Sequence, residues 1–355
     1  MGAAGDEAWR RSRDGAIGFG VIETPDLPET PSSRARGLVS QLLKIGVSGA
    51  ALWFVGRNID FPSMRRVLAA TDPTPVATVM GIYLVGQALT AWRWRLIASR
   101  VGFSRSMGDF LRYYFIGMFF NLFGPSTLGG DVVRSLYLGA AEGRRVVAFH
   151  TVFFDRLSGL VMLVFVAVAA IALFGTFGLP WPIVATATVA GLGMGFGWFL
   201  LPAIARRVFS RTGRINRMVE QELGPFWRDR QLLLRTAGIS AGFHVLQILS
   251  LILLGHALSM HVDWRYYFIF HPLVTVLSAL PLSLAGLGIR EAGYVWFLER
   301  QGVADDTAFA FGLLWFAVLL VSSMVGGLVY AWGGAGVPPL RATPKADPPT
   351  VSGKD

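Results

Sequence analysis

Residues 119–134 read FFNLFGPSTLGGDVVR, and no single straight helix can accommodate this stretch. The Gly-Pro pair at 124–125 interrupts a helix, because proline lacks a backbone donor and its ring collides with the preceding turn. Ser126 can cap a second helix that begins just beyond the break. Two glycines and an Asp-x-x-Arg pair follow directly. The stretch therefore predicts two helical arms that meet at a polar break.

The composition places this break in a membrane protein. The 355 residues are 53% hydrophobic and 15% charged, whereas about 25% charged is typical of soluble proteins. Residues 157–205 contain no Asp, Glu, Lys or Arg, and a spanning helix needs only about 20 apolar residues. The sequence predicts an all-α polytopic bundle of about six full spans. Two opposed re-entrant helical hairpins are expected to complete it.

The first hairpin is predicted from the lengths of its arms. Arms at 111–123 and 128–140 each have about 13 residues and extend about 20 Å, which is too short for a hydrocarbon core of about 30 Å. A second broken segment covers residues 264–300. The full spans are expected at 38–56, 75–97, 146–174, a fourth that returns to residue 205, 233–258 and 308–332.

Arginine-rich loops set the expected orientation. The loops at 93–105, 142–145 and 206–230 fall on one side, which the positive-inside rule makes the cytoplasmic side. The run Trp92-Arg93-Trp94-Arg95 resembles an interface anchor. We expect a multi-pass protein of a bacterial plasma (inner) membrane with both termini in the cytoplasm. The expected domains are a disordered tail (1–36), a transmembrane domain (37–334) and a disordered Pro-rich tail (335–355).

Charge and residue content exclude several function classes. The net charge of +10 comes from arginines beside spans, so we predict no nucleic-acid partner. The chain has no cysteine, which excludes disulfides, thiol catalysis and Cys-ligated metals. The histidines lack the spacing of metal ligands, so they are expected to be packed or interfacial. No cofactor and no metal are expected.

A short internal match suggests a repeat. The pentapeptide RYYFI at 112–116 recurs at 265–269, and each copy leads into a segment rich in Pro, Ser and Gly. By the predicted topology the two copies enter the membrane from opposite sides. Transporters built from inverted repeats place their binding site at the midplane, between discontinuous helices. Chance similarity is the alternative.

Polar residues near the two breaks form the candidate site. Charged groups at membrane depth are costly unless they are paired or hydrated. One interpretation is a wet cavity whose arginines hold an anionic lipid headgroup; the other is a set of structural ion pairs, with glycines that pack helices. The candidate residues are Asn121, Ser126, Gly129, Gly130, Asp131, Arg134, Asp155, Arg156, Ser283, Gly286, Gly288, Arg290 and Glu291.

These motifs resemble a known family. The signature Asn121…Pro125…Gly129-Gly130-Asp131-x-x-Arg134, the pair Asp155-Arg156 and the run at 281–291 are similar to the flippase-like transmembrane domain of lysylphosphatidylglycerol synthases and its stand-alone relatives. The resemblance covers about residues 38–333. It implies a membrane domain that moves or handles phospholipids or polyprenyl-type lipids between leaflets. The synthases' soluble domain has no counterpart in this sequence, so lysyl transfer is not expected.

The resulting expectation is a non-enzymatic protein that translocates or handles an anionic lipid, with membrane lipids as partners. Two alternatives remain open. One is a membrane enzyme that uses buried acids as general acid and base. The other is a non-catalytic partner that presents lipid to a separate lipid-modifying transferase, in a lipid-linked glycan or aminoacyl-lipid pathway.

Overall fold

The computed structural model describes residues 61–123, 128–208, 224–280 and 286–332, together with Trp53, Arg57 and Ser283. The predicted span at 38–56 is described only at Trp53. Both predicted tails, Ser126 and most of the basic loop at 206–230 lie outside the described residues. All regular structure in the described part is helical.

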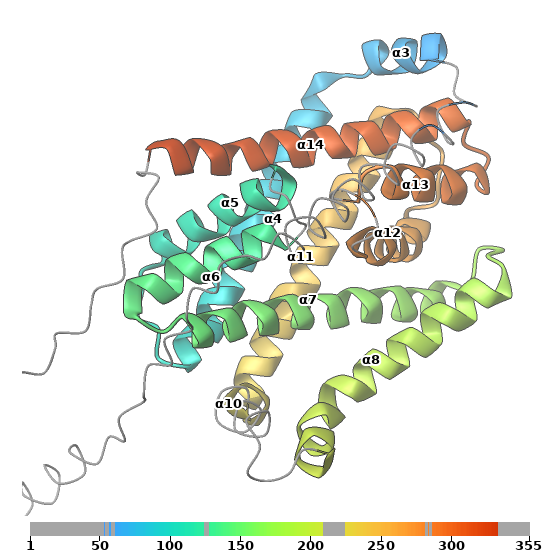
Figure 1. Ribbon diagram of the computed structural model, residues 1–355. Coiled ribbons are helices and arrows are strands. Elements are labelled where there is room, and N and C mark those ends of the chain that lie inside the picture. Colours follow the sequence, from blue (N-terminus) through green and yellow to red (C-terminus); the bar gives the residue numbers. More distant parts are fainter. Residues whose placement is uncertain are drawn as a thin grey trace, which may run out of the picture. The chain divides into compact units, whose positions relative to one another are not determined.

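The described residues form eleven helices (Figure 1). Their bounds are α3 Phe61–Ala70, α4 Pro73–Arg100, α5 Met107–Phe123, α6 Gly129–Glu142, α7 Arg145–Phe174, α8 Trp181–Val208, α10 Gly224–Arg228, α11 Arg230–Ala257, α12 Trp264–Ala279, α13 Ile289–Glu299 and α14 Asp305–Trp332.

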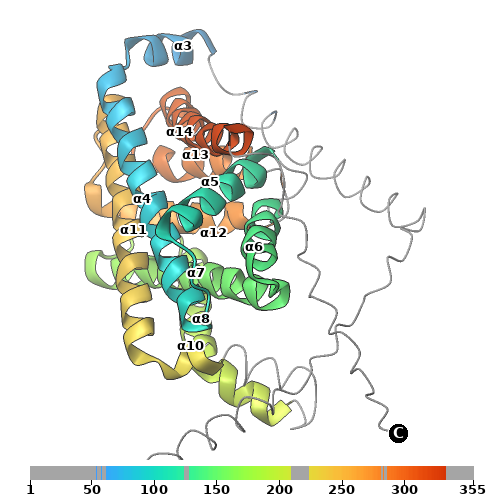
Figure 2. The same cartoon turned by 90° about the vertical axis from the view of Figure 1, so that its left-hand side faces the viewer.

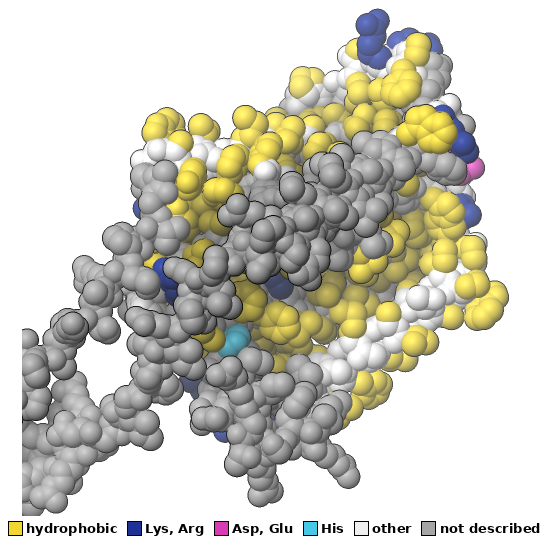
Figure 3. Space-filling view, in the orientation of Figure 1, with side chains coloured by type: hydrophobic (Ala, Val, Ile, Leu, Met, Phe, Trp, Pro, Cys, Tyr) yellow, Lys and Arg dark blue, Asp and Glu magenta, His cyan; other side chains and the backbone are white. Residues whose placement is uncertain are grey.

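Four of these helices, α4, α7, α11 and α14, are long and apolar enough to cross a membrane. They coincide with four of the predicted spans, so a multi-pass membrane protein is confirmed. α8 coincides with the span predicted to return to residue 205, and its crossing stays a prediction. Most of the described surface visible in Figure 3 is hydrophobic, as a lipid-facing surface requires. Phe165, Val321 and Leu328 are among the exposed hydrophobic side chains of the described residues.

Each predicted break separates two shorter helices. α5 and α6 flank the first break, and their bounds lie within four residues of the predicted arms. α12 and α13 flank the second break. There Gly286 and Gly288 have φ of 76° and 83°, a left-handed conformation that glycine adopts without a steric penalty. Separate helices on either side of each break are therefore confirmed, whereas the re-entrant path of each hairpin through a membrane stays a prediction.

Two sets of four helices, α4–α7 and α11–α14, share one order and one pattern of packing. Each set has a 28-residue helix, two shorter helices and a long final helix. α4 lies along α11 and runs in the opposite direction (Figure 2). α7 packs against α6 and α12, and α14 packs against the corresponding helices α13 and α5. Each final helix thus contacts one arm of each hairpin.

The helix ends repeat as well. Asp72 caps α4 and Asp229 caps α11 through side-chain bonds to backbone N–H groups. Just beyond the same two helices, Gly102 and Ser259 both adopt positive φ, 86° and 56°. Both pairs are 157 residues apart. The repetition is therefore visible in helix boundaries and turns.

The matched pentapeptides do not occupy equivalent places in this arrangement. Arg112 follows the start of α5 at Met107 by five residues, whereas Arg265 follows the start of α12 at Trp264 by one. The match is displaced by four residues, about one helical turn. The sequence similarity that suggested a repeat is thus out of register with the helices.

Candidate functional site

Asp155 of α7 is the centre of a buried charge cluster, and it is only 1% exposed. Its Oδ1 accepts a hydrogen bond from Arg93 Nε of α4 at 2.8 Å. Its Oδ2 accepts from both terminal nitrogens of Arg134 of α6, at 3.2 and 3.3 Å. Arg93 also donates to Ser240 Oγ of α11 at 2.7 Å. One carboxylate therefore joins three helices directly, and Arg93 extends the network to a fourth.

Asp131, in the first turn of α6, is shared by two arginines. Its carboxylate lies 3.1 Å from Arg134 Nε and 2.8 Å from Arg156 Nε. The cluster thus contains three guanidinium groups, from Arg93, Arg134 and Arg156, and two carboxylates. Within the part of the chain that the structure describes, one positive charge is left without a carboxylate, and an uncompensated charge is costly at membrane depth. An anionic ligand would balance it.

Arg134 is held between two aromatic rings. Its guanidinium carbon lies 5.1 Å from the ring centroid of Trp94 and 5.1 Å from that of Tyr114. A cation over an aromatic face is stabilised by the ring quadrupole. Arg134 is 3% exposed, so it acts as a fixed internal cation.

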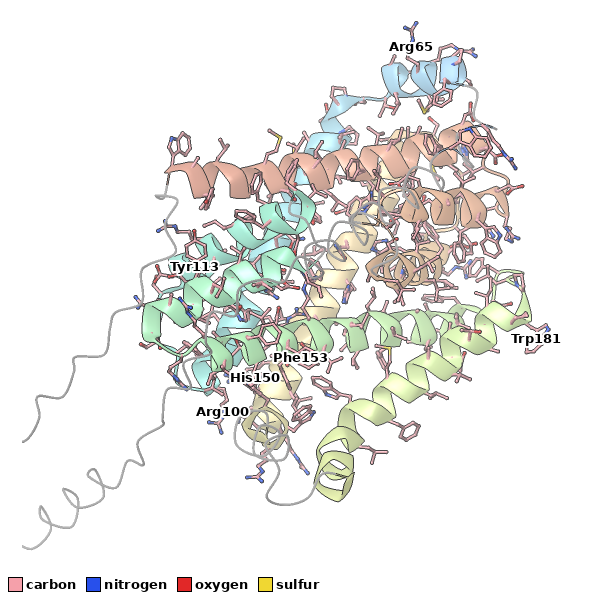
Figure 4. The ribbon with its side chains drawn as sticks, viewed as in Figure 1. Arg65, Arg100, Tyr113, His150, Phe153 and Trp181 are labelled. Atoms are coloured by element: carbon pink, nitrogen blue, oxygen red, sulfur yellow. The ribbon has the colours of Figure 1, made fainter. Side chains whose placement is uncertain are left out.

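Arg156 differs from the other two arginines because its side chain is 53% exposed. It follows the start of α7 at Arg145 by eleven residues, which corresponds to a depth of about 16 Å. His150 and Phe153 precede it on α7 (Figure 4), and Phe153 is also 50% exposed. Arg156 is therefore the member of the cluster that a ligand can reach.

The second break contains a smaller charged pair. Arg290 Nη2 donates to Glu291 Oε1 at 2.7 Å, and Glu291 Oε2 accepts from the Gly288 N–H at 2.6 Å. The Arg290 guanidinium lies 5.1 Å from the Phe316 ring of α14. Unlike the first cluster, this pair is neutral. Ser283 is fully buried beside the break, and its Oγ has no hydrogen-bond partner among the described residues.

Charged residues from both sets of helices act on Tyr83 of α4. The Tyr83 hydroxyl of α4 is within electrostatic reach of Arg156 and of Arg290, and also of Tyr114. Tyr83 contacts Trp315 of α14 edge to face at 5.6 Å, and only 8% of its surface is exposed. One arginine from each set of helices therefore acts on the same buried hydroxyl.

The small residues of the first signature hold the hairpin together. A Cβ on Gly130 would lie 1.7 Å from the Gly117 carbonyl oxygen of α5, and one on Gly129 would lie 3.2 Å from the Phe120 carbonyl oxygen. Asn121 Oδ1 accepts a hydrogen bond from the Gly130 N–H at 2.9 Å. At these positions the structure favours close helix packing, one of the two interpretations of the glycines.

Sequence reasoning missed Arg93, and the interface-anchor interpretation of its run was wrong for Arg93 and Trp94. Arg93 is 4% exposed and Trp94 is fully buried. A basic residue near the end of an apolar run looks the same whether it faces headgroups or an internal carboxylate, so the local pattern carries no distinguishing signal. Among the described residues, no three His, Asp or Glu side chains come together as metal ligands do.

Comparison with known proteins supports the resemblance seen in the motifs. A family model described as the lysylphosphatidylglycerol synthase TM region matches residues 41–327. A protein named UPF0104 membrane protein, from Methanothermobacter thermautotrophicus, is 22% identical over 307 residues. That alignment covers 78% of this chain and 87% of the relative. The family match includes both breaks and nearly all of the final helix of each set.

Proposed function

This chain belongs to the lysylphosphatidylglycerol synthase TM region family, and from that premise we propose that it translocates an anionic membrane lipid between leaflets. The lipid phosphate binds at Arg156. The acyl chains remain in the surrounding bilayer while the headgroup passes between the two hairpins. Binding and passage involve no change of covalent bonds.

The unbalanced positive charge beside a half-exposed arginine carries the proposal. Asp131 bonds both Arg134 and Arg156, at 3.1 and 2.8 Å. A phosphate that arrives at Arg156 can replace Asp131 there, and Asp131 keeps its bond to Arg134. Charge-assisted hydrogen bonds between arginine and phosphate are strong and directional. Because the phosphate replaces the carboxylate at Arg156, the headgroup can enter and no arginine loses its anionic partner.

The second hairpin provides the exit from this site. In the proposed arrangement α4–α7 and α11–α14 form an inverted repeat, and equivalent helices enter from opposite membrane faces. The antiparallel contact of α4 with α11 supports this orientation. Arg290 then receives the phosphate at the second hairpin. Both termini lie on the cytoplasmic side.

A catalytic role fits the buried acids less well. Asp131, Asp155 and Glu291 all accept hydrogen bonds from arginines. A general acid or base must be free to exchange a proton with a substrate, whereas these carboxylate oxygens are already engaged by guanidinium groups. We therefore assign these acids to the positioning of arginines.

Reconstituted vesicles test the proposal. A fluorescent phosphatidylglycerol in the inner leaflet should become accessible to an external quencher faster when the protein is present. Loss of a hydrogen bond to a charged group costs about 1.5–3 kcal/mol. Arg156→Gln should therefore lower the rate of protein-dependent translocation at least about tenfold.

The matched control is Arg100→Gln, which removes a half-exposed arginine that pairs with Asp229 at 2.9 Å, at the end of α4. This variant should keep the wild-type rate. Wild-type translocation by Arg156→Gln would rule out the assignment of the site. No protein-dependent translocation of any anionic lipid would rule out the function.

A further inference from the structure

The two hairpins carry different side chains at equivalent positions. α5 and α12 begin 157 residues apart, as do the capped helices that precede them, and α6 and α13 begin 160 residues apart. In the first arms, the 157-residue spacing pairs Tyr114 with His271. In the second arms, the 160-residue spacing pairs Asp131 with Glu291 and Arg134 with Tyr294.

Contacts between the arms agree with this pairing. In the first hairpin, the Arg134 guanidinium lies 5.1 Å from the Tyr114 ring. In the second hairpin, the Tyr294 hydroxyl and His271 Nδ1 share a hydrogen bond of 3.1 Å. In both hairpins, the residue five positions after the start of the second arm contacts the equivalent residue of the first arm. The first hairpin has a permanent cation at this contact, and the second has an imidazole that can gain or lose a proton.

One ring nitrogen of His271 is available to carry an additional proton. It is 2% exposed, and its Nε2 has no hydrogen-bond partner among the described residues. The charged pair beside it, Arg290 and Glu291, is neutral. Protonation of His271 would give the second break the same single excess positive charge that Arg93, Arg134 and Arg156 give the first.

The surroundings of His271 favour its protonation only when an anion binds nearby. Arg290 and Tyr294 of α13 and His244 of α11 act on it electrostatically or by hydrogen bonding, and the Trp315 ring of α14 lies 6.1 Å away. The carboxylate of the neighbouring pair, Glu291, already accepts hydrogen bonds from Arg290. A cation in such a place is costly without a counter-ion, so an imidazolium is favoured only when an anion arrives with it.

We propose that His271 is a proton-binding site that couples phosphate binding at the second break to proton uptake. The ligand class is a monoanionic phosphodiester headgroup, which binds together with one proton beside Arg290. This inference rests on the proposed function, because it deepens the role of the second hairpin. Linkage is reciprocal, so the affinity for the headgroup rises as the pH falls.

Tryptophan fluorescence tests the binding step without transport. Trp315 lies next to His271, and a protonated imidazole quenches indole emission more strongly than a neutral one. Short-chain phosphatidylglycerol added to the purified protein should quench emission more strongly as the pH is lowered, because the anion that arrives at Arg290 offsets the cost of a buried imidazolium. His271→Gln and Trp315→Phe should each remove this pH-dependent part. His256→Gln, at an exposed histidine of α11, should retain it.

An unchanged pH-dependent quench in His271→Gln, or the same quench without phosphatidylglycerol, would overturn the inference. If His271→Gln does not fold, Tyr294→Phe serves instead, since it removes only a hydroxyl that bonds Nδ1. It should move the midpoint of the pH response, and an unmoved midpoint counts against the proposal.

Vesicle translocation separates this inference from the function on which it rests. Wild-type translocation of fluorescent phosphatidylglycerol should accelerate by up to about tenfold per pH unit of acidification, the limit for one linked proton. His271→Gln should show a flat profile. Translocation that is independent of pH in the wild type overturns the proton linkage and leaves the function standing. Proton-linked binding without translocation supports the site and overturns the function.

Discussion

At the scale of single residues, the two aspartates of the first cluster have different tasks. Asp155 is 1% exposed and accepts hydrogen bonds from Arg93 and Arg134. Asp131 bonds the half-exposed Arg156. Asp155 therefore joins helices in the buried interior, and in the proposed function Asp131 regulates the arginine that a ligand reaches.

Replacement of Asp155 by Asn should be strongly destabilising. The amide keeps the size of the side chain but removes the charge that compensates Arg93 and Arg134, which are 4% and 3% exposed. Removal of one partner from a buried ion pair costs about 3–5 kcal/mol. Denaturant unfolding in detergent should show this loss. Glu299→Gln, at an exposed position at the end of α13, is the control, and equal stability of the two variants would contradict the assignment.

The sequence predicts these charged residues but not all of their partners. The spacing of Asp131 and Arg134 makes them neighbours on one helical face, and their side chains are 3.1 Å apart. In the sequence motif Asp155 and Arg156 are adjacent and look like a pair. In the structure Asp155 forms ion pairs with arginines of α4 and α6, and Arg156 forms one with Asp131. Adjacent residues on a helix point in different directions, so their partners depend on which helices pack around them. That packing is not readable from a local motif.

At the scale of helices, caps and close contacts fix the boundaries. Asp229 Oδ1 accepts the Leu232 N–H at 3.0 Å at the start of α11. This hydrogen bond, with help from Arg100, holds the pKa of Asp229 below its usual value of 3.8. A carboxyl with a lowered pKa in the folded state stabilises the protein above its unfolded pKa. That contribution is lost as the pH falls through the folded value.

Acidification should therefore abolish the difference in melting temperature between wild type and Asp229→Asn. Near about pH 6 the variant should melt at a lower temperature, because its amide lacks the charge that favours the helix N-terminus and Arg100. Once the pH has fallen below the lowered pKa of Asp229, the two should melt alike. Asp72→Asn provides the matched comparison at the equivalent cap of α4, where Thr74 N–H is the bonded donor at 2.8 Å. A difference in melting temperature that does not change with pH would refute the charge assignment.

The contact between α5 and α6 should not tolerate a methyl group. Because a Cβ on Gly130 would lie 1.7 Å from the Gly117 carbonyl oxygen, Gly130→Ala must separate the two helices. Overpacking of this kind costs about 1–3 kcal/mol or more, which should appear in thermal unfolding. Gly193→Ala in α8 is the control, since its Cβ would meet nothing within 4 Å. Equal melting temperatures would mean that the arms are not in contact.

Helix lengths were more predictable than helix register. Apolar runs and the Gly-Pro and Gly-x-Gly breaks located the helices to within a few residues. The repeated pentapeptide pointed to two similar halves but placed them one turn out of register. Helix starts are set by caps such as Asp263, which bonds the Arg265 N–H at 2.9 Å. A short match of large aromatic residues does not include the cap. It therefore does not fix how far those residues lie from the start of the helix.

At the scale of the whole described bundle, function depends on how the two sets of helices face each other. α7 contacts one arm of each hairpin, and so does α14. A shift of either hairpin would therefore alter the surroundings of Arg156 on α7 and of Phe316 on α14. If equivalent helices enter from opposite membrane faces, the two breaks meet at similar depth. The orientation of α4 and α11 is the point on which this depends.

Two single cysteines test that orientation. Thr74 and Gln231 are exposed, lie 157 residues apart and occupy equivalent places in the first turns of α4 and α11. Because the chain has no cysteine of its own, Thr74→Cys and Gln231→Cys each introduce one reactive thiol. In intact cells a membrane-impermeant thiol reagent should label the thiol at position 74, and the thiol at position 231 should react only after the membrane is opened. Labelling of both from the same side would make α4 and α11 parallel across the membrane. The two breaks would then open toward one face, and an alternating passage for a headgroup between leaflets could not be built from them.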